Sequence, residues 1–436
     1  MTPTLFRFAT TLTAILTTAC LPVSIWAAPD MALLRVTGQR DPAEFSCPTP
    51  RARAGAPTPR VGTPTASGTF TATAARAALV DTPAELTLGP APQAHATPPG
   101  LKLGLWGDSH TASGTFADSL LEALRKPQAQ THPSFIAPTF GLKGVRPPLR
   151  RACLSDDWQL SLAYRTPSES PQAYAKSLAH IRTETAGSFM WLDFRYPEAH
   201  TRVKWADIHV AKDAAERSLV LGITVDDGAE AVVHLGPGHS QRLRVQADQA
   251  FATLKLRVIA GQIRIDGIAP VYDGPTQAIV DVFSIPGATA KGWRVVDTAH
   301  LRREDPLDSG YDVVILQSGT NESLDPDFKV GLYEAQLNAS LTRLKAAYPQ
   351  ARCILIGPPD AKRSADTVRL INNSQQRLAA AKGCAHWNWQ KAMGGPGASV
   401  RWLAKGLMQA DLLHLSPAGY TQSARSLASA VQTQPR

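Results

Sequence analysis

Short, almost continuous apolar runs predict buried strands at residues 101–106, 311–317, 353–356 and 384–389. Strands of a parallel sheet have this pattern because both of their faces are covered. The spacing of apolar residues predicts one helix that starts near residue 111, two helices at residues 328–347 and 365–381, and a fourth that starts near residue 417. Strands that alternate with helices predict an α/β fold with a parallel sheet.

The pattern changes between residues 153 and 272, where short alternating runs follow one another with turn residues between them. Such runs cover residues 188–196, 218–225 and 252–265 and predict an all-β sandwich. We therefore expect an α/β domain in two parts, residues 100–150 and 275–436, interrupted by a sandwich at residues 151–274. Its aromatic residues Trp191, Tyr196 and Trp205 fit either a sugar-stacking surface or the core of the sandwich.

The N-terminal 99 residues have a different composition from the rest of the chain. Residues 1–28 resemble a secretory signal, with Arg7 before an apolar stretch and small residues at 27–28, so we expect export to the periplasm. Cys20 follows a poor match to a lipoprotein cleavage box, and lipid attachment is the less favoured alternative. Residues 29–99 are rich in Pro, Ala and Thr and predict a linker with one short strand at residues 86–88. No later segment has the apolar length of a membrane span.

Charge narrows the range of partners only slightly. The formal net charge of the 436 residues is +9, and removal of residues 1–28 takes away one arginine and leaves about +8. The excess fits either affinity for an anionic envelope polymer or an ordinary solvated surface. Lys and Arg are scattered without a recognisable module, which argues against nucleic-acid binding. Nothing in the sequence fixes an oligomeric state.

Four cysteines remain outside the predicted signal: Cys47, Cys153, Cys353 and Cys384. An even number in an exported chain allows two disulfides. Cys353 and Cys384 open consecutive predicted strands, which favours a bond between them and leaves Cys47 to pair with Cys153. Buried free thiols are the alternative.

The chemistry is concentrated where the predicted strands end. The first strand runs into GDSHTAS at residues 107–113, so Ser109 is expected at the carboxyl edge of the sheet, where α/β sites form. Asn321 follows the second strand, and Asp411 precedes His414 by three residues ahead of the last helix. A serine needs a neutral imidazole to take its proton, and the imidazole needs a carboxylate to orient it. The Ser109 N–H and the Asn321 amide are expected to stabilise an oxyanion.

These motifs resemble the SGNH, or GDSL-type, hydrolases. The first, third and fifth blocks of that family correspond to residues 107–109, 319–321 and 411–414. The resemblance implies a flavodoxin-like three-layer sandwich with Ser109, Asp411 and His414 as catalytic residues. It also implies that a glycine N–H joins Ser109 and Asn321 in the oxyanion hole, and Gly287 is the best match, with Gly292 as a competitor.

Almost 180 residues separate the first two blocks. The serine block at residues 107–112, the predicted sandwich after it and the stretch MGGPG at residues 393–397 together resemble bacterial peptidoglycan O-acetylesterases, whose insert resembles a carbohydrate-binding module. This resemblance implies hydrolysis of the acetyl ester on the C6 hydroxyl of N-acetylmuramic acid, with O-acetylated peptidoglycan as substrate. Two alternatives remain: an O-acetyltransferase that uses the same triad on an envelope polysaccharide, and an inert glycan-binding envelope protein.

No cofactor or metal is expected. The 11 histidines include no pair at metal-binding spacing. His110, next to the predicted nucleophile, fits a substrate contact or simple packing equally well and is left out of the triad.

Overall fold

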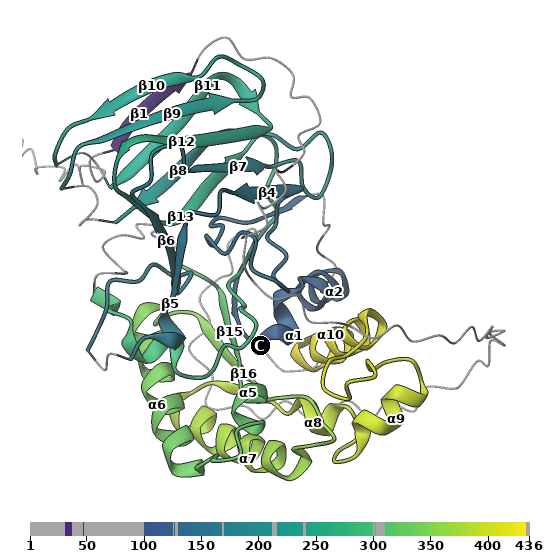
Figure 1. Cartoon of the computed structure of the whole chain (residues 1–436). Coiled ribbons are helices and arrows are strands. Elements are labelled where there is room, and N and C mark those ends of the chain that lie inside the picture. Colours follow the sequence, from purple (N-terminus) through teal and green to yellow (C-terminus); the bar gives the residue numbers. More distant parts are fainter. Residues whose placement is uncertain are drawn as a thin grey trace, which may run out of the picture.

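The computed structural model describes residues 31–36, 47, 100–124, 126, 130–167, 170–211, 216–238, 241–299, 301 and 310–432. Figure 1 shows two bodies, an α/β domain that carries the helices and a sandwich of strands stacked against it. The chain enters the α/β domain at residue 100, passes into the sandwich and returns, as the colours along the ribbon indicate.

A parallel sheet forms the centre of the α/β domain. Its strands are β2 (Leu101–Trp106), β3 (Thr131–His132), β14 (Ala278–Val282), β15 (Val313–Gln317), β16 (Arg352–Ile356) and β17 (Ala385–Trp387). They lie in the order β17-β16-β15-β2-β14-β3, and every pair is parallel. The carboxyl ends of β2, β14 and β15 therefore meet at one edge, as the positions of the motifs predicted.

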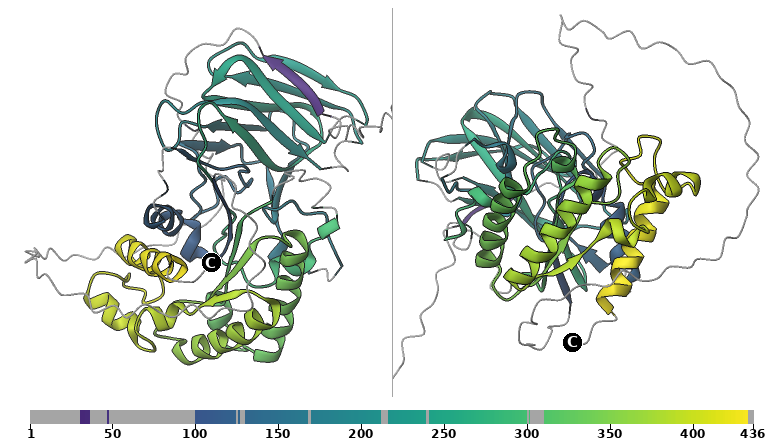
Figure 2. Two further views of the ribbon diagram at one scale, coloured as in Figure 1. Left: turned by 180° about the vertical axis from the view of Figure 1, so that it is seen from behind. Right: turned by 90° about the horizontal axis from the view of Figure 1, so that it is seen from below.

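Helices cover both faces of this sheet, which gives the three predicted layers. One face lies under α2 (Thr115–Ala123), α8 (Trp389–Ala392), α9 (Ala398–Ala404) and α10 (Pro417–Gln432), the other under α6 (Val330–Ala347) and α7 (Ala365–Lys382). In the view from below in Figure 2, the green helices and the yellow helix lie on opposite sides of the strands. Leu105 and Ile315 pack on the first face, and their neighbours Trp106 and Leu316 on the second, because successive side chains of a strand point to opposite faces.

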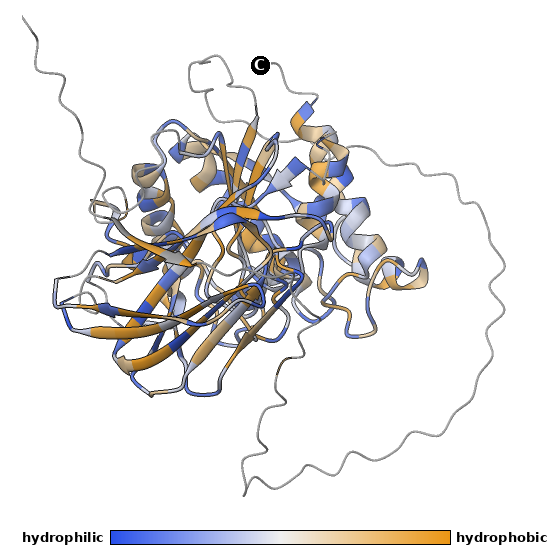
Figure 3. Cartoon of the chain, turned by 90° about the horizontal axis from the view of Figure 1, so that it is seen from above, coloured by the Kyte–Doolittle hydropathy of each residue, from blue (hydrophilic) through white to orange (hydrophobic). Residues whose placement is uncertain are grey.

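The inserted body is a sandwich of two sheets. One sheet consists of β1 (Met31–Val36), β5 (Gln159–Leu162), β6 (Ala179–Thr183), β8 (Val203–Val210), β11 (Arg242–Phe251) and β13 (Ile263–Tyr272). The other consists of β4 (Arg151–Leu154), β7 (Phe189–Asp193), β9 (Leu219–Val225), β10 (Ala231–Leu235) and β12 (Thr253–Gly261). Apolar and polar residues alternate along these strands (Figure 3), and the apolar set forms one buried core.

The strand β1 corrects the linker prediction for residues 31–36. It pairs in parallel with β11, so that Met31 lies opposite Arg242. Leu34 and Val36 turn into the sandwich core and are only 6% and 2% exposed. Six residues carry little local signal, and contacts with a strand far along the sequence fix their conformation.

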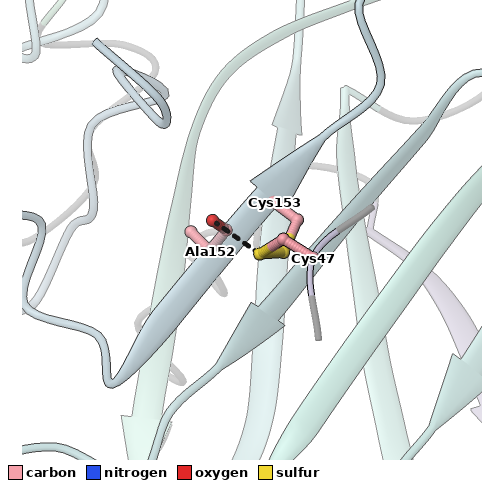
Figure 4. The surroundings of a disulfide bond; sticks show 3 residues. All are labelled: Cys47, Ala152 and Cys153. Carbon is pink, nitrogen blue, oxygen red and sulfur yellow. Dashed lines mark hydrogen bonds between the residues drawn. A yellow bond between two sulfur atoms is a disulfide. The ribbon is translucent and has the colours of Figure 1, made fainter. Parts of the chain in front are cut away.

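Both predicted disulfides are present, and the alternative of free thiols is therefore wrong. Cys47 is bonded to Cys153 on β4 (Figure 4), and Cys353 on β16 is bonded to Cys384, which precedes β17. The second bond joins neighbouring strands of the parallel sheet, as the sequence predicted.

The two bodies are joined by the segment that follows β3. Ile136 pairs with Ile268 of β13, and both N–H···O bonds of this bridge are formed. Phe135 packs over Gly267, where an added Cβ would lie 2.1 Å from its ring. Two short 3₁₀ helices, η2 (Ala163–Arg165) and η3 (Gly292–Val295), also contact each other near this junction.

Several sequence-based predictions lie outside the described residues, namely the signal at residues 1–28, Cys20 and the strand at residues 86–88. Within the described ranges, none of the helices combines the length and the apolar character that crossing a bilayer requires.

Candidate active site

Ser109 lies where the sequence predicts it, at the carboxyl end of a central strand. It is the first residue of α1 (Ser109–Ala112), which follows β2 after Gly107 and Asp108. A Cβ at Gly107 would lie 2.2 Å from Thr111 Oγ1 and 2.7 Å from Gln317 Oε1, so only glycine fits this turn.

Asp108 fixes the turn at residues 107–109, which carries Ser109 and is called the serine turn below. Its side chain is fully buried and caps α1 by accepting the N–H of His110 at 2.9 Å. Gln317, at the end of β15, accepts the Asp108 N–H through Oε1 at 2.8 Å and donates from Nε2 to Asp108 Oδ2 at 2.9 Å. The serine turn is therefore fixed to the neighbouring strand by a reciprocal pair of hydrogen bonds.

Ser109, His414 and Asp411 form one chain of hydrogen bonds. Ser109 Oγ lies 3.0 Å from His414 Nε2, and His414 Nδ1 lies 2.7 Å from Asp411 Oδ2. The first pair joins side chains 305 positions apart in sequence. The imidazole is 31% exposed and the carboxylate 46%, so the group is open to solvent.

Local backbone contacts orient Asp411. Its Oδ1 accepts the N–H groups of Leu413 and His414 at 3.0 and 2.9 Å. Burial acts to raise the pKa of Asp411, but the hydrogen bonds from the His414 side chain and from these N–H groups outweigh it and hold the pKa below its ordinary value. Leu412 between them has φ +55°, a left-handed conformation that is strained for leucine. Such strain persists where the surrounding structure fixes a functional geometry.

The candidate oxyanion donors lie around the same turn. The Ile285 N–H donates to Gly107 O at 2.9 Å, which brings the loop containing Gly287 against the serine turn. The N–H groups of Ser109 and Gly287 donate to no acceptor among the described residues. Asn321 donates from Nδ2 to Ala288 O at 2.7 Å, and an amide nitrogen has a second hydrogen to offer. Gly287 is exposed with φ +81°, and no atom lies within 4 Å of where a Cβ would be.

Gly292, the competitor of Gly287, has a different position. It is buried at the start of η3, and a Cβ there would lie 3.2 Å from Leu178. Its N–H points at Thr289 O, 3.5 Å away. This placement favours Gly287 as the glycine of the site.

His110, whose role the sequence left open, lies next to the hydrogen-bonded chain of Ser109, His414 and Asp411. Its fully buried ring lies 5.4 Å from the ring of His414 and 5.5 Å from that of Trp389, and Nδ1 is 3.1 Å from Tyr420 Oη. Burial lowers the pKa of His110 to about 4, with the His414 charge acting in the same direction and Asp108 against it. The ring is therefore neutral at neutral pH and packs behind His414.

Glu322 is a residue that the sequence reasoning missed. It is the third residue of α5 (Thr320–Ser323), and its Oε1 accepts the N–H of Ala290 at 2.7 Å. Burial raises the pKa of Glu322 to about 7, although hydrogen bonds from the backbone of Ala290, Glu322 and Gly319 oppose the shift. Glu322 lies three residues after the N-cap Gly319, which is the position of the acidic residue in a capping box. This spacing is the feature of the sequence that could have identified Glu322. Glu322 and Asn321 thus tie α5 to the loop at residues 288–290.

The described residues contain no group of three or more His, Cys, Asp or Glu side chains placed to hold a metal ion.

Two aromatic residues of the sandwich that the sequence singled out are in contact with protein. Trp191 is 5% exposed, and the Arg244 guanidinium lies 4.6 Å above the Trp205 ring. The Trp191 ring is thus buried, and one face of the half-buried Trp205 ring is covered by Arg244.

Residues 267–422 match the model of the GDSL-like Lipase/Acylhydrolase family. This range includes Gly287, Asn321, Asp411 and His414 and begins after Ser109. A search of curated protein sequences finds no match.

Among solved structures, a peptidoglycan O-acetylesterase is 22% identical, with a TM-score of 0.57 over 76% of this chain and 91% of that one. A family two carbohydrate esterase from Cellvibrio japonicus is 11% identical (TM-score 0.24, 65% of this chain and 97% of that one). A salicylyl-acyltransferase from a tetracycline biosynthetic pathway is 13% identical (TM-score 0.27, 65% and 98%). Only the first likeness is close enough to compare folds.

The first likeness covers most of the chain, and it agrees with the parallel sheet and the additional antiparallel sheets described above. Together with the family match, it confirms the fold predicted from the sequence. Residues 267–422 thus form a GDSL-like lipase/acylhydrolase domain on an SGNH fold, and these findings support a carboxylic ester hydrolase.

Proposed function

We propose that the chain removes O-acetyl groups from cell-wall peptidoglycan through an acetyl-serine intermediate. The observation that carries the chemistry is the continuous hydrogen-bonded chain from Asp411 through His414 to Ser109. In this proposal Ser109 is the nucleophile, His414 the general base and Asp411 the residue that orients the imidazole.

In the first half-reaction, His414 Nε2 takes the proton of Ser109 as Oγ attacks the acetyl carbonyl carbon. The carbonyl electron pair moves to oxygen, and the tetrahedral intermediate collapses as His414 donates its proton to the leaving sugar oxygen. In the second, water loses a proton to His414 and attacks the acetyl-serine, which releases acetate and restores Ser109.

The developing oxyanion would lie among the N–H groups of Ser109 and Gly287 and the second amide hydrogen of Asn321. Two facts support this assignment: the first two donors have no acceptor among the described residues, and the amide of Asn321 is held by Ala288. Each such donor is typically worth a few kcal/mol in the transition state, about 10²-fold or more in rate.

The choice of substrate is supported by the likeness to a peptidoglycan O-acetylesterase, which covers 76% of this chain and 91% of that one. The carboxyl ester lies on the C6 hydroxyl of N-acetylmuramic acid in this proposal. The chain would meet this polymer in the periplasm, after export through the N-terminal signal.

Trapping the intermediate tests the mechanism. The chain is mixed with an aryl acetate, quenched in acid within milliseconds and digested for mass spectrometry. We expect the peptide that contains Ser109 to gain the mass of one acetyl group, and we expect no gain in Ser109→Ala. Acetylation of another residue, or aryl acetate turnover by Ser109→Ala at the parent rate, would overturn the assignment.

A further inference from the structure

Residues 285–290, called the oxyanion loop below, contact one end of the inserted sandwich. In Figure 1, β5 lies at that end, beside the α/β domain. A small apolar cluster there contains residues from the insert and from the loop: Leu162, Tyr164 and Ala179, and Ile285 and Ala288. The insert therefore packs directly on the loop that carries Gly287.

Tyr164, the middle residue of η2, reaches this loop from the insert. It lines a small cavity whose other walls include Gly107 of the serine turn, Ala288 and Gln317. Its hydroxyl donates to Pro286 O at 3.4 Å. Burial raises the pKa of Tyr164 above its ordinary value, so the hydroxyl keeps its proton and can donate. Tyr164 thus lies between the insert and the catalytic edge of the sheet.

Further contacts hold η2 in this position. The Ala163 N–H donates to Leu178 O at 2.9 Å. A Cβ at Gly292 would lie 3.2 Å from Leu178 and 3.9 Å from Tyr164 Cβ. Leu178 has φ +55°, a left-handed conformation that persists only where the surrounding structure fixes it. Backbone packing therefore sets the position of the Tyr164 ring, and we expect the ring to stay in place when the hydroxyl is removed.

The oxyanion loop makes a tight turn at Gly287. The Ala288 N–H donates to Ile285 O at 2.9 Å. Pro286 and Gly287 are the central residues, and φ is +81° at Gly287, as in a type II β-turn. The peptide group between Pro286 and Gly287 is trans and planar, so its C=O and its N–H point in opposite directions. A group that holds Pro286 O thereby fixes the direction of the Gly287 N–H.

We propose that Tyr164 is a positioning residue, which holds the Pro286–Gly287 peptide group so that its N–H faces the oxyanion of the reaction. The inference rests on the proposed function, because it deepens the role given there to Gly287. The insert then contributes to the hydrolysis of any ester, with or without glycan binding.

The hydrogen bond from Tyr164 acts mainly in the transition state. When the Gly287 N–H binds a negative oxygen, the peptide group polarises and Pro286 O becomes a stronger acceptor, so the bond from Tyr164 strengthens as the charge develops. A bond that is long in the free chain and tightens in the transition state raises kcat and changes KM little.

The test compares Tyr164→Phe with the parent chain on an aryl acetate. Phe keeps the ring in the apolar cluster and removes only the hydroxyl. The matched control is Tyr174→Phe, because Tyr174 is a buried tyrosine between η2 and β6 whose ring stacks on His180. The measurements are kcat, KM, the urea midpoint of unfolding and inhibition by an alkylboronic acid, which adds to a catalytic serine as a tetrahedral anion.

We expect Tyr164→Phe to lower kcat about tenfold, with KM within about twofold of the parent value and an unchanged urea midpoint. The inhibition constant of the boronic acid should rise by a similar factor, because its adduct uses the same donors. Tyr174→Phe should keep the parent values. Parent kcat in Tyr164→Phe, a fall in kcat without weaker inhibition, or an equal fall in the control would overturn the proposal.

The proposed function and this inference fail in different ways. If the parent cleaves the aryl acetate through Ser109 and Tyr164→Phe does so at the parent rate, only the role of Tyr164 is wrong. If Tyr164→Phe behaves as expected but the parent releases no acetate from peptidoglycan, the proposed substrate is wrong and the role of Tyr164 stands. If Ser109→Ala keeps the parent rate, the proposed mechanism is wrong, and the role of Tyr164 falls with it.

Discussion

Replacing Glu322 by Gln should change how the stability of the protein depends on pH. The carboxyl of Glu322 accepts the N–H of Ala290 through Oε1, while its Oε2 is buried without a hydrogen-bond partner among the described residues. Gln keeps a side-chain oxygen for Ala290 and does not titrate. The substitution therefore isolates the ionisation of Glu322 from its role as an acceptor.

The structure sets the sign and size of the effect. Burial raises the pKa of Glu322 from an ordinary 4.5 to about 7 in the folded protein. Between these values the folded chain keeps a proton that the unfolded chain has lost, so the contribution of Glu322 to the free energy of unfolding falls as pH rises. At about 1.4 kcal/mol for each pKa unit, the loss amounts to about 3 kcal/mol by pH 7.5.

The measurement is urea unfolding of parent and Glu322→Gln at pH 4.5 and pH 7.5. Buried histidines titrate in both chains and cancel in the comparison. We expect the variant to gain stability relative to the parent by up to about 3 kcal/mol between the two pH values. Asp366→Asn removes a carboxylate that is 92% exposed and serves as the control. A relative stability that stays constant within about 0.5 kcal/mol would refute the reasoning.

Three further predictions concern the packing and the catalytic group. Burial lowers the pKa of His110 from 6.5 to about 4. As pH drops between these values, the contribution of His110 to the free energy of unfolding falls by about 3 kcal/mol. His110→Asn should remove this part of the acid sensitivity, as measured by urea unfolding. Cys353→Ala/Cys384→Ala should lower the free energy of unfolding by about 4 kcal/mol, because the bond closes a loop with a sequence separation of 31. Asp411→Asn should lower kcat for an aryl acetate by at least about a hundredfold, because it leaves His414 without the carboxylate that orients its ring.

Each of these three predictions would be contradicted by a specific result. An unchanged acid limb in His110→Asn would mean that the ring is charged in the folded protein. A disulfide variant as stable as the parent would mean that the Cys353–Cys384 bond does not stabilise the folded protein. An Asp411→Asn variant with parent kcat would leave the imidazole oriented by something other than Asp411.

The sequence predicted those parts of the fold whose signal is local. The apolar runs of β2, β15 and β16 and the helical spacing of α6 and α7 are confirmed, because each element buries side chains at the period of its own geometry. The strand β1 escaped prediction because its pairing with β11 is a contact between distant segments.

The same distinction separates the predicted and unpredicted parts of the site. Ser109, Asp411 and His414 could be selected from the sequence because a serine nucleophile needs a histidine and a carboxylate, and all three lie near predicted strand ends and helix starts. The roles of Gln317 and Glu322 depend on hydrogen bonds to Asp108 and Ala290, which only the folded chain brings together. The burial of His110 against Trp389 and Tyr420 likewise depends on the C-terminal third of the chain.

Acetate released from O-acetylated peptidoglycan is the measurement that tests the central claim most directly. The purified chain is compared with Ser109→Ala, and acetylated xylan serves as the competing substrate. The account predicts release from peptidoglycan by the parent, loss of that release in Ser109→Ala by several orders of magnitude, and little release from xylan. Release from xylan alone, or from neither polymer while an aryl acetate is still cleaved, would contradict the assignment of this serine esterase to the cell wall.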